Sequence, residues 1–194
     1  MTSPKTKTAI FISGRGSNMV ALVEASKAAD FPADFALVVS NDPTAAGLEW
    51  AASQGIDTLA VDHKTYGKDR EAHERAIDAE LRARGIEFIC LAGYMRILTP
   101  WLVEQWSGKM INIHPSLLPK YKGLHTHERA IEAGDAEGGC SIHWVSPGVD
   151  DGDVIAQARV PILDGDTPDA LAARVLKEEH KLYAATVRQI LTKK

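Results

Sequence analysis

The sequence predicts an α/β fold, a Rossmann-like parallel sheet flanked by helices, followed by an antiparallel hairpin and one long helix. In the first 110 residues or so, short apolar runs typical of buried strands alternate with helical stretches. Each unit is short enough for the right-handed crossovers of a doubly wound sheet. Further on, residues 139–145 and 154–160 read as two strands joined by a short connection, which favours an antiparallel hairpin.

Size and composition fit a single domain over residues 1–194. Apolar residues make up 45% of the chain and the formal net charge is −4, so no basic excess points to nucleic acid. We expect no membrane contact, because no apolar run approaches the roughly 20 residues of a span, and no secretory signal core is present. Cys90 and Cys140 form no Cys-x-x-Cys motif and are expected as reduced thiols in a cytoplasmic protein.

The first unit is a strand at residues 8–12, a glycine-rich turn and a helix at residues 19–29. Such a turn aims backbone N–H groups and a helix N-terminus at an anion. The spacing matches neither a Walker A loop nor the dinucleotide fingerprint. Taken alone, the turn is equally consistent with a monophosphate site and with a tight connection. Its residues are Gly14, Arg15, Gly16, Ser17 and Asn18.

The next elements follow in order up to the central strand. The helix at residues 68–84 carries many charges, which are most simply a solvated face. The apolar cluster at residues 93–98 follows a buried strand and, without other information, reads as a cap on the core. Thr99 is expected as an N-cap with Pro100 at the first helical position. The expected ranges are strands 35–40, 58–61 and 86–92 and helices 45–54, 68–84 and 100–106.

In the remaining part, a loop at residues 115–123 leads to a helix at residues 126–133 and then to the hairpin. Thr167 caps the last helix with Pro168 at its first position, and the helix runs to about residue 191. This division gives a half at residues 1–110 that binds a nucleotide and a half at residues 111–194 that carries the catalytic groups.

The central strand begins at Met110 and ends in two polar residues on one face. Side chains alternate along a strand, so Asn112 and His114 point the same way. Pro115 then ends the ladder because it has no N–H to donate. Asn112 can donate to a developing oxyanion and His114 can carry a proton near neutral pH. Asp150, in a tight glycine-flanked loop, could orient or protonate the histidine. As an isolated pair, the two polar residues could also simply satisfy backbone groups.

The residues that follow favour a catalytic role for this pair over a purely structural one. The run Asn-Ile-His-Pro-Ser-Leu-Leu-Pro at residues 112–119, followed by Tyr121, Gly123, His125 and Ala130, resembles the signature of the formyltetrahydrofolate-dependent transferases. The resemblance covers nearly the whole chain and is greatest to members that formylate glycinamide ribonucleotide in purine (IMP) biosynthesis. It implies a formyltransferase-type fold, N10-formyltetrahydrofolate as co-substrate, no metal, and the catalytic residues Asn112, His114 and Asp150.

The same resemblance implies two binding sets. The ribonucleotide would contact the phosphate-binding loop and the last helix, through Gly14, Arg15, Gly16, Ser17, Asn18 and Glu179. The folate would contact the loops around the central strands, through Arg70, Met95, Arg96, Ile97, Leu98, Asn112, Ser146, Pro147, Gly148, Val149 and Asp150. Arg15 and Asp153 depart from the family pattern. Arg15 would add charge to the phosphate or point to solvent, and Asp153 would alter the shape of its loop.

Several of these residues are also compatible with other roles. His125 and His127 would share a face on a strand, but no ligand set with metal spacing surrounds them. Asp150, Asp151 and Asp153 lack the calcium-loop pattern. His143 either faces the site or packs within its strand. Ser116 lies in no nucleophile elbow.

Other members of the resembled family, and a protein of a non-catalytic class, offer competing functions. A methionyl-tRNA formyltransferase would carry a further C-terminal domain and a basic surface, and a formyltetrahydrofolate hydrolase a further N-terminal domain. A non-catalytic nucleotide sensor on the same sheet would tolerate loss of Asn112. The expected partners are small-molecule substrates, without nucleic acid or membrane, and the expected state is a monomer or weak homodimer.

Overall fold

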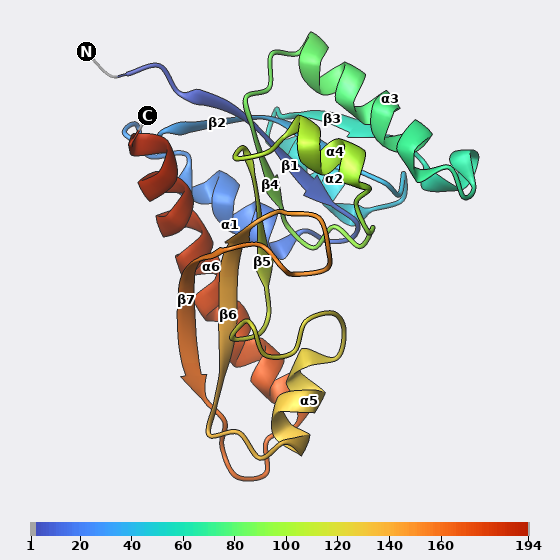
Figure 1. Cartoon of the computed structure of the whole chain (residues 1–194). Coiled ribbons are helices and arrows are strands. Elements are labelled where there is room, and N and C mark those ends of the chain that lie inside the picture. The colour runs from blue at the N-terminus through green and yellow to red at the C-terminus, as the bar shows by residue number, and fades with distance from the viewer. Residues whose placement is uncertain (1–2, 194) are drawn as a thin grey trace.

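A computed structural model describes residues 3–193, and residues 1, 2 and 194 of the expected domain lie outside the described residues. One seven-stranded sheet forms the centre of the molecule, in the order β3-β2-β1-β4-β5-β6-β7 (Figure 1). Its strands are β1 (Thr6–Ile12), β2 (Ala33–Ser40), β3 (Asp57–Ala60), β4 (Phe88–Leu91), β5 (Met110–His114), β6 (Glu137–Trp144) and β7 (Val154–Pro161).

The strand directions change after β5, and the last two strands form the predicted antiparallel hairpin. Strands β1 to β5 pair in parallel, whereas β6 pairs antiparallel with both β5 and β7. The β6–β7 hairpin is therefore added to the edge of a parallel sheet. In its register, Asn112 of β5 lies opposite His143 of β6.

Helices cover both faces of the sheet, so each face has its own apolar core. Helices α1, α2 and α6 pack on one face and α3 and α4 on the other. Helix α5 lies near the start of β6, away from the connection between β6 and β7 (Figure 1). The helices are α1 (Ser17–Ala25), α2 (Ala46–Ser53), α3 (Arg70–Ala83), α4 (Pro100–Gln105), α5 (Thr126–Glu132) and α6 (Pro168–Thr192), with a short 3₁₀ turn η1 (His63–Tyr66).

The long helix α6 is fastened to the centre of the sheet. Its Tyr183 is fully buried and donates a hydrogen bond from its hydroxyl to the carbonyl oxygen of Leu91 in β4, over 2.8 Å. Thr167 caps the helix, since its side chain accepts from the Ala170 N–H, and Pro168 occupies the first turn as predicted. No helix within residues 3–193 has the length and apolar character needed to cross a membrane.

Helix α3 differs from its prediction in one respect that matters for the site. Most of its charges face solvent, but Glu74 is only 3% exposed. Its carboxylate accepts hydrogen bonds from the N–H and the hydroxyl of Thr99. Thr99 is indeed the N-cap residue of α4, yet its side chain bonds Glu74 instead of capping the helix. The description of α3 as having a wholly solvated charged face was wrong at this position.

Candidate active site

The predicted catalytic residues of β5 lie at the C-terminal end of the strand, beside a cavity. Asn112 is half-buried and His114 is buried, and both line one large cavity. The strand places them on one face because side chains two positions apart share a side of the pleat. Pro115 follows directly, and the chain leaves the sheet there.

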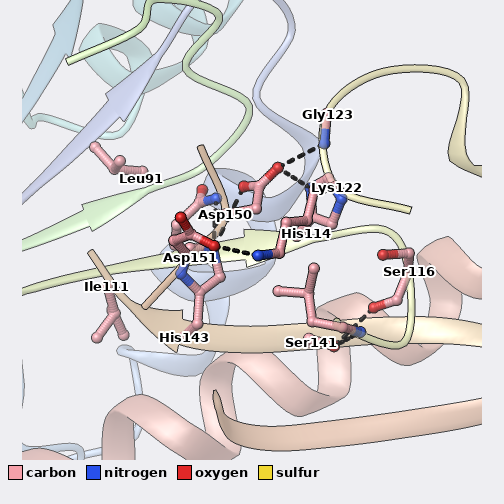
Figure 2. Close-up of polar contacts among 12 residues, drawn as sticks. Leu91, Ile111, His114, Ser116, Lys122, Gly123, Ser141, His143, Asp150 and Asp151 are labelled. Carbon is pink, nitrogen blue, oxygen red and sulfur yellow. Dashed lines mark hydrogen bonds and ion pairs between the residues drawn. The ribbon is translucent and has the colours of Figure 1, made fainter. Parts of the chain in front are cut away.

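His114 is held on both ring nitrogens. Nε2 lies 2.9 Å from the carbonyl oxygen of Tyr121. Nδ1 lies 3.4 Å from Oδ2 of Asp150, and Figure 2 shows the two side chains facing each other. A carbonyl oxygen only accepts hydrogen bonds, so Nε2 carries the hydrogen. Nδ1 therefore presents a lone pair to Asp150 in the neutral ring and an N–H in the protonated ring. This geometry suits a proton that passes between the imidazole and the carboxylate.

Asp150 reaches His114 from the connection between β6 and β7. Its backbone is left-handed, with φ of 52°, and its Oδ2 accepts the N–H of Gly123 over 2.9 Å (Figure 2). Burial alone would raise the pKa of the Asp150 carboxyl. The contact with His143, the Gly123 hydrogen bond and the charge of His114 outweigh burial, so the pKa lies below its usual value. The carboxyl is therefore ionised at neutral pH.

His143 faces the site, which answers the question that its sequence position left open. Its Nδ1 lies 3.0 Å from the carbonyl oxygen of Trp144, so Nδ1 carries the hydrogen. Its Nε2 is then free to accept from the side-chain amide of Asn112, 3.1 Å away. Asp150 Oδ1 lies 3.6 Å from the same nitrogen. His143 thus orients the amide of Asn112 and borders Asp150.

The cavity beside these residues has a volume of about 880 Å³. Its apolar wall is the loop at residues 93–98, where Met95 is 67% and Ile97 63% exposed. The residues expected to bind folate that line the cavity come from the wall, from β5 and from the loop after β6. They are Met95, Arg96, Ile97, Leu98, Asn112, Ser146, Gly148, Val149 and Asp150. The other two residues expected for folate, Arg70 and Pro147, are not among the described residues that line the cavity. Arg70 instead donates to the carbonyl oxygen of Ile97 from outside the wall, over 3.3 Å.

The glycine-rich loop lies between β1 and α1 and carries the left-handed residue that starts the helix. Gly16 has φ of 68°, and α1 begins at Ser17 without a side-chain cap. The loop packs against the start of α2, where Gly47 donates its N–H to the carbonyl oxygen of Gly14 over 3.1 Å. A Cβ at Gly47 would lie 2.9 Å from the carbonyl oxygen of Arg15, so glycine is required for this approach.

Of the residues expected for the ribonucleotide, Asn18 and Glu179 line the cavity, and the other loop residues lie outside its described lining. Glu179 is buried on the inner face of α6. Burial raises the pKa of its carboxyl, and the hydrogen bond from Asn18 only partly opposes that effect. The site therefore holds a second acidic group whose pKa is shifted in the opposite direction from that of Asp150.

His125 and His127 both line the cavity, but they belong to different local structures. His125 precedes α5 with φ of 57°, and its Nδ1 lies 2.8 Å from Glu128. His127 lies within α5 and lines the cavity, where burial lowers the pKa of its imidazole. In residues 3–193, no three His, Cys, Asp or Glu side chains come together in an arrangement that could hold a metal ion.

Tyr121 and Gly123 belong to the signature in the sequence, but the sequence did not show what they do in the site. The carbonyl of Tyr121 and the amide of Gly123 act through their backbone, and Tyr121 is left-handed with φ of 57°. Backbone groups of a loop cannot be assigned from residue types. Glu74 could have been found, because it lies three and seven positions before Ile77 and Leu81 on the buried face of α3.

The fold and the site together are those of a transferase of one-carbon groups, and the chain belongs to the formyl transferase family, whose model matches residues 6–187. It is similar to phosphoribosylglycinamide formyltransferase of Escherichia coli strain K12, with 43% identity over 92% of this chain and 84% of that protein. The solved phosphoribosylglycinamide formyltransferase of Brucella melitensis has a TM-score of 0.92, at 47% identity and 96% coverage of both chains.

The animal relatives are much longer. The human trifunctional purine biosynthetic protein adenosine-3 is 43% identical over 96% of this chain, but the match covers only 18% of that protein. The chain thus spans less than a fifth of the length of the trifunctional relatives that it matches.

Proposed function

We propose that this chain transfers the formyl group of N10-formyltetrahydrofolate to the amine of glycinamide ribonucleotide, giving formylglycinamide ribonucleotide and tetrahydrofolate in purine (IMP) synthesis. The observation that carries the proposal is the convergence of Asn112, His114 and Asp150 on one cavity with an apolar wall. The bacterial relatives of similar length bear the name of this activity.

The first step is attack of the neutral amine on the formyl carbon. The carbonyl π electrons move to oxygen and form a tetrahedral oxyanion. The Asn112 amide, held by His143, donates a hydrogen bond to the oxyanion, and the positive charge of His114 in its protonated form stabilises it. Loss of one such donor typically costs roughly 3–4 kcal/mol of barrier.

The second step moves one proton and breaks one bond. The nitrogen that attacked loses a proton, and N10 of the folate gains one as the bond between the formyl carbon and N10 breaks. Asp150, ionised at neutral pH, receives the proton from the amine, and a bound water delivers it to N10 of the folate. The electrons on the oxyanion reform the carbonyl, so that no covalent enzyme intermediate is required.

The two substrates would occupy different parts of the site. The loop of Gly14, Arg15, Gly16 and Ser17, with Asn18 and Glu179, would hold the ribonucleotide. The folate ring would lie against the wall of Met95, Arg96, Ile97 and Leu98, with the segment from Ser146 to Asp150 on the other side. Arg70 would act by supporting the wall, and Pro147 by shaping the latter segment. Holding both substrates makes the attack effectively intramolecular.

The proposal extends to the setting of the enzyme. We propose one formyltransferase domain whose two parts, residues 1–110 and 111–194, both contribute to the cavity. The two cysteines are buried and unpaired, which suits the reducing cytoplasm. We propose that the protein is a monomer or weak homodimer that uses neither metal nor nucleic acid.

The test measures both products. Purified protein is incubated with glycinamide ribonucleotide and N10-formyltetrahydrofolate without added metal, and folate absorbance is followed beside formylated product by mass spectrometry. A parallel reaction omits the ribonucleotide. Deformylation that requires the ribonucleotide, with one formylated product per folate, supports the proposal. Equal deformylation without the ribonucleotide would identify a hydrolase, and ribonucleotide binding without turnover would identify a sensor.

A further inference from the structure

The apolar wall at residues 93–98 lies beside the glycine-rich loop because their strands are neighbours. Strands β1 and β4 pair in parallel, and the Ala92 N–H donates to the carbonyl oxygen of Phe11 over 2.9 Å. Both loops therefore leave the sheet at the same edge. The parts of the site proposed for the ribonucleotide and for the folate thus begin one strand apart.

Ser13, the first residue after β1, joins these two loops. Its hydroxyl oxygen accepts the backbone N–H of Met95 over 2.8 Å. The same hydroxyl donates to Oδ1 of Asn41 over 2.6 Å. Asn41 is buried, and its Nδ2 lies 3.1 Å from Nδ1 of His63. The hydroxyl has one hydrogen, which Asn41 takes, so the lone pairs that remain face the Met95 amide.

The rest of the wall is held from the opposite side. Arg70 bonds the carbonyl oxygen of Ile97, and Glu74 bonds Thr99 at the end of the wall. These two residues belong to α3, which does not contact the glycine-rich loop through any hydrogen bond in the described part of the chain. Among the hydrogen bonds of residues 3–193, the one that joins the wall to the segment at residues 13–18 runs from the Met95 N–H to the Ser13 hydroxyl.

We propose that Ser13 is a positioning residue that couples the two substrate subsites, so that occupation of the glycine-rich loop tightens binding at the apolar wall and the reverse. This inference rests on the proposed function. A ligand that orders the glycine-rich loop also fixes the Ser13 hydroxyl, which in turn fixes the Met95 amide. The folate then meets a wall already in position. Because coupling between two binding sites is reciprocal, the folate tightens ribonucleotide binding by the same factor.

The two subsites can be filled together without reaction by using glycinamide ribonucleotide and tetrahydrofolate, which lacks the formyl group. Isothermal titration gives the Kd of tetrahydrofolate with and without saturating ribonucleotide. In the wild-type protein we expect the ribonucleotide to lower this Kd by about 5-fold or more, the range of ordinary couplings. In Ser13→Ala we expect the ratio of the two Kd values to fall to about 1.

Two further variants separate coupling from general damage. Ser13→Thr keeps a hydroxyl and should restore the ratio. Ser53→Ala removes an exposed serine of α2 whose hydroxyl donates only to the Trp50 carbonyl oxygen, and should keep the wild-type ratio. If Ser13→Ala does not fold, Ser13→Cys gives the same measurement, since a thiol is a weak hydrogen-bonding group of similar size.

The outcomes are distinct. A wild-type ratio near one, or an unchanged ratio in a folded Ser13→Ala or Ser13→Cys protein, overturns the coupling while the proposed function stands. A wild-type protein that fails to bind the ribonucleotide and makes no formylated product overturns the proposed function, and the coupling with it. Loss of the ratio in Ser13→Ala with recovery in Ser13→Thr supports the inference.

Discussion

The side-chain amide of Asn18 donates to the carboxylate of Glu179 over 3.2 Å, which joins the first helix of the chain to the last. Both residues are buried and line the cavity. Oδ1 of Asn18 is also buried, and within the described residues it has no hydrogen-bond partner. Buried acceptors are normally satisfied, so we propose that this oxygen accepts a hydrogen bond from a substrate.

Glu179→Gln should stabilise the protein at neutral pH while weakening the proposed ribonucleotide binding. Burial raises the pKa of the Glu179 carboxyl, so its ionised form opposes folding. This destabilisation is absent below the pKa that the Glu179 carboxyl has in the unfolded chain. It grows as pH rises and is complete above the raised pKa in the folded protein. We expect a higher Tm for the variant at pH 7.5 and nearly equal Tm values near pH 4. The KM for the ribonucleotide should rise by about 10-fold or more. A lower Tm at pH 7.5 would contradict this assignment.

Asp150→Asn should lower kcat by about 10²–10⁴-fold, the usual contribution of a general acid or base. The sign of its stability effect is opposite to that of Glu179. The pKa of Asp150 is lowered, so the carboxylate stabilises the fold above the unfolded pKa and that stability is lost as pH falls through the folded pKa. Urea unfolding at neutral pH should therefore show a less stable variant. Asp164→Asn, on an exposed turn, is the matched control.

Asn112→Ala and His143→Ala should be strongly non-additive. His143 acts on the reaction through the amide that it orients, at 3.1 Å. We expect Asn112→Ala to lower kcat by about 10²–10³-fold and His143→Ala by a smaller factor. In the double variant, kcat should be close to that of Asn112→Ala alone, because contacting residues couple. Effects that multiply fully would show that His143 acts independently of Asn112.

Gly47→Ala should displace the glycine-rich loop. The added Cβ would lie 2.5 Å from Cδ1 of Ile12 and 2.9 Å from the carbonyl oxygen of Arg15. Overpacking of this kind typically destabilises by about 1–3 kcal/mol. We expect a higher KM for the ribonucleotide with a smaller change in the KM for folate, measured by varying each substrate in turn. Equal changes in both KM values would point to a general loss of structure.

Local patterns in the sequence predicted most of the fold and part of the site. The alternation of Asn112 and His114 placed both on one face, because strand geometry fixes that relation within five residues. The approach of Asp150 followed from family resemblance, since no local rule brings a loop 36 positions away to a given histidine. The switch of Thr99 from a helix cap to a partner of Glu74 depends on the packing of α3 against α4. Sequence spacing does not specify that contact.

In the antiparallel β6–β7 hairpin, the paired strands extend the sheet and the connection between them carries the proton-transfer residue Asp150. The register of the two strands is fixed by a ladder that pairs Glu137 with Pro161 at one end and His143 with Val154 at the other. Asp150 lies in the connection beyond that ladder, whereas its partner His114 ends a strand of the parallel sheet. The ladder therefore fixes the strand register, whereas the position of Asp150 depends on the connection's own contacts, such as the hydrogen bond from the Gly123 N–H. The framework of the sheet and the geometry of proton transfer are thus open to separate substitutions.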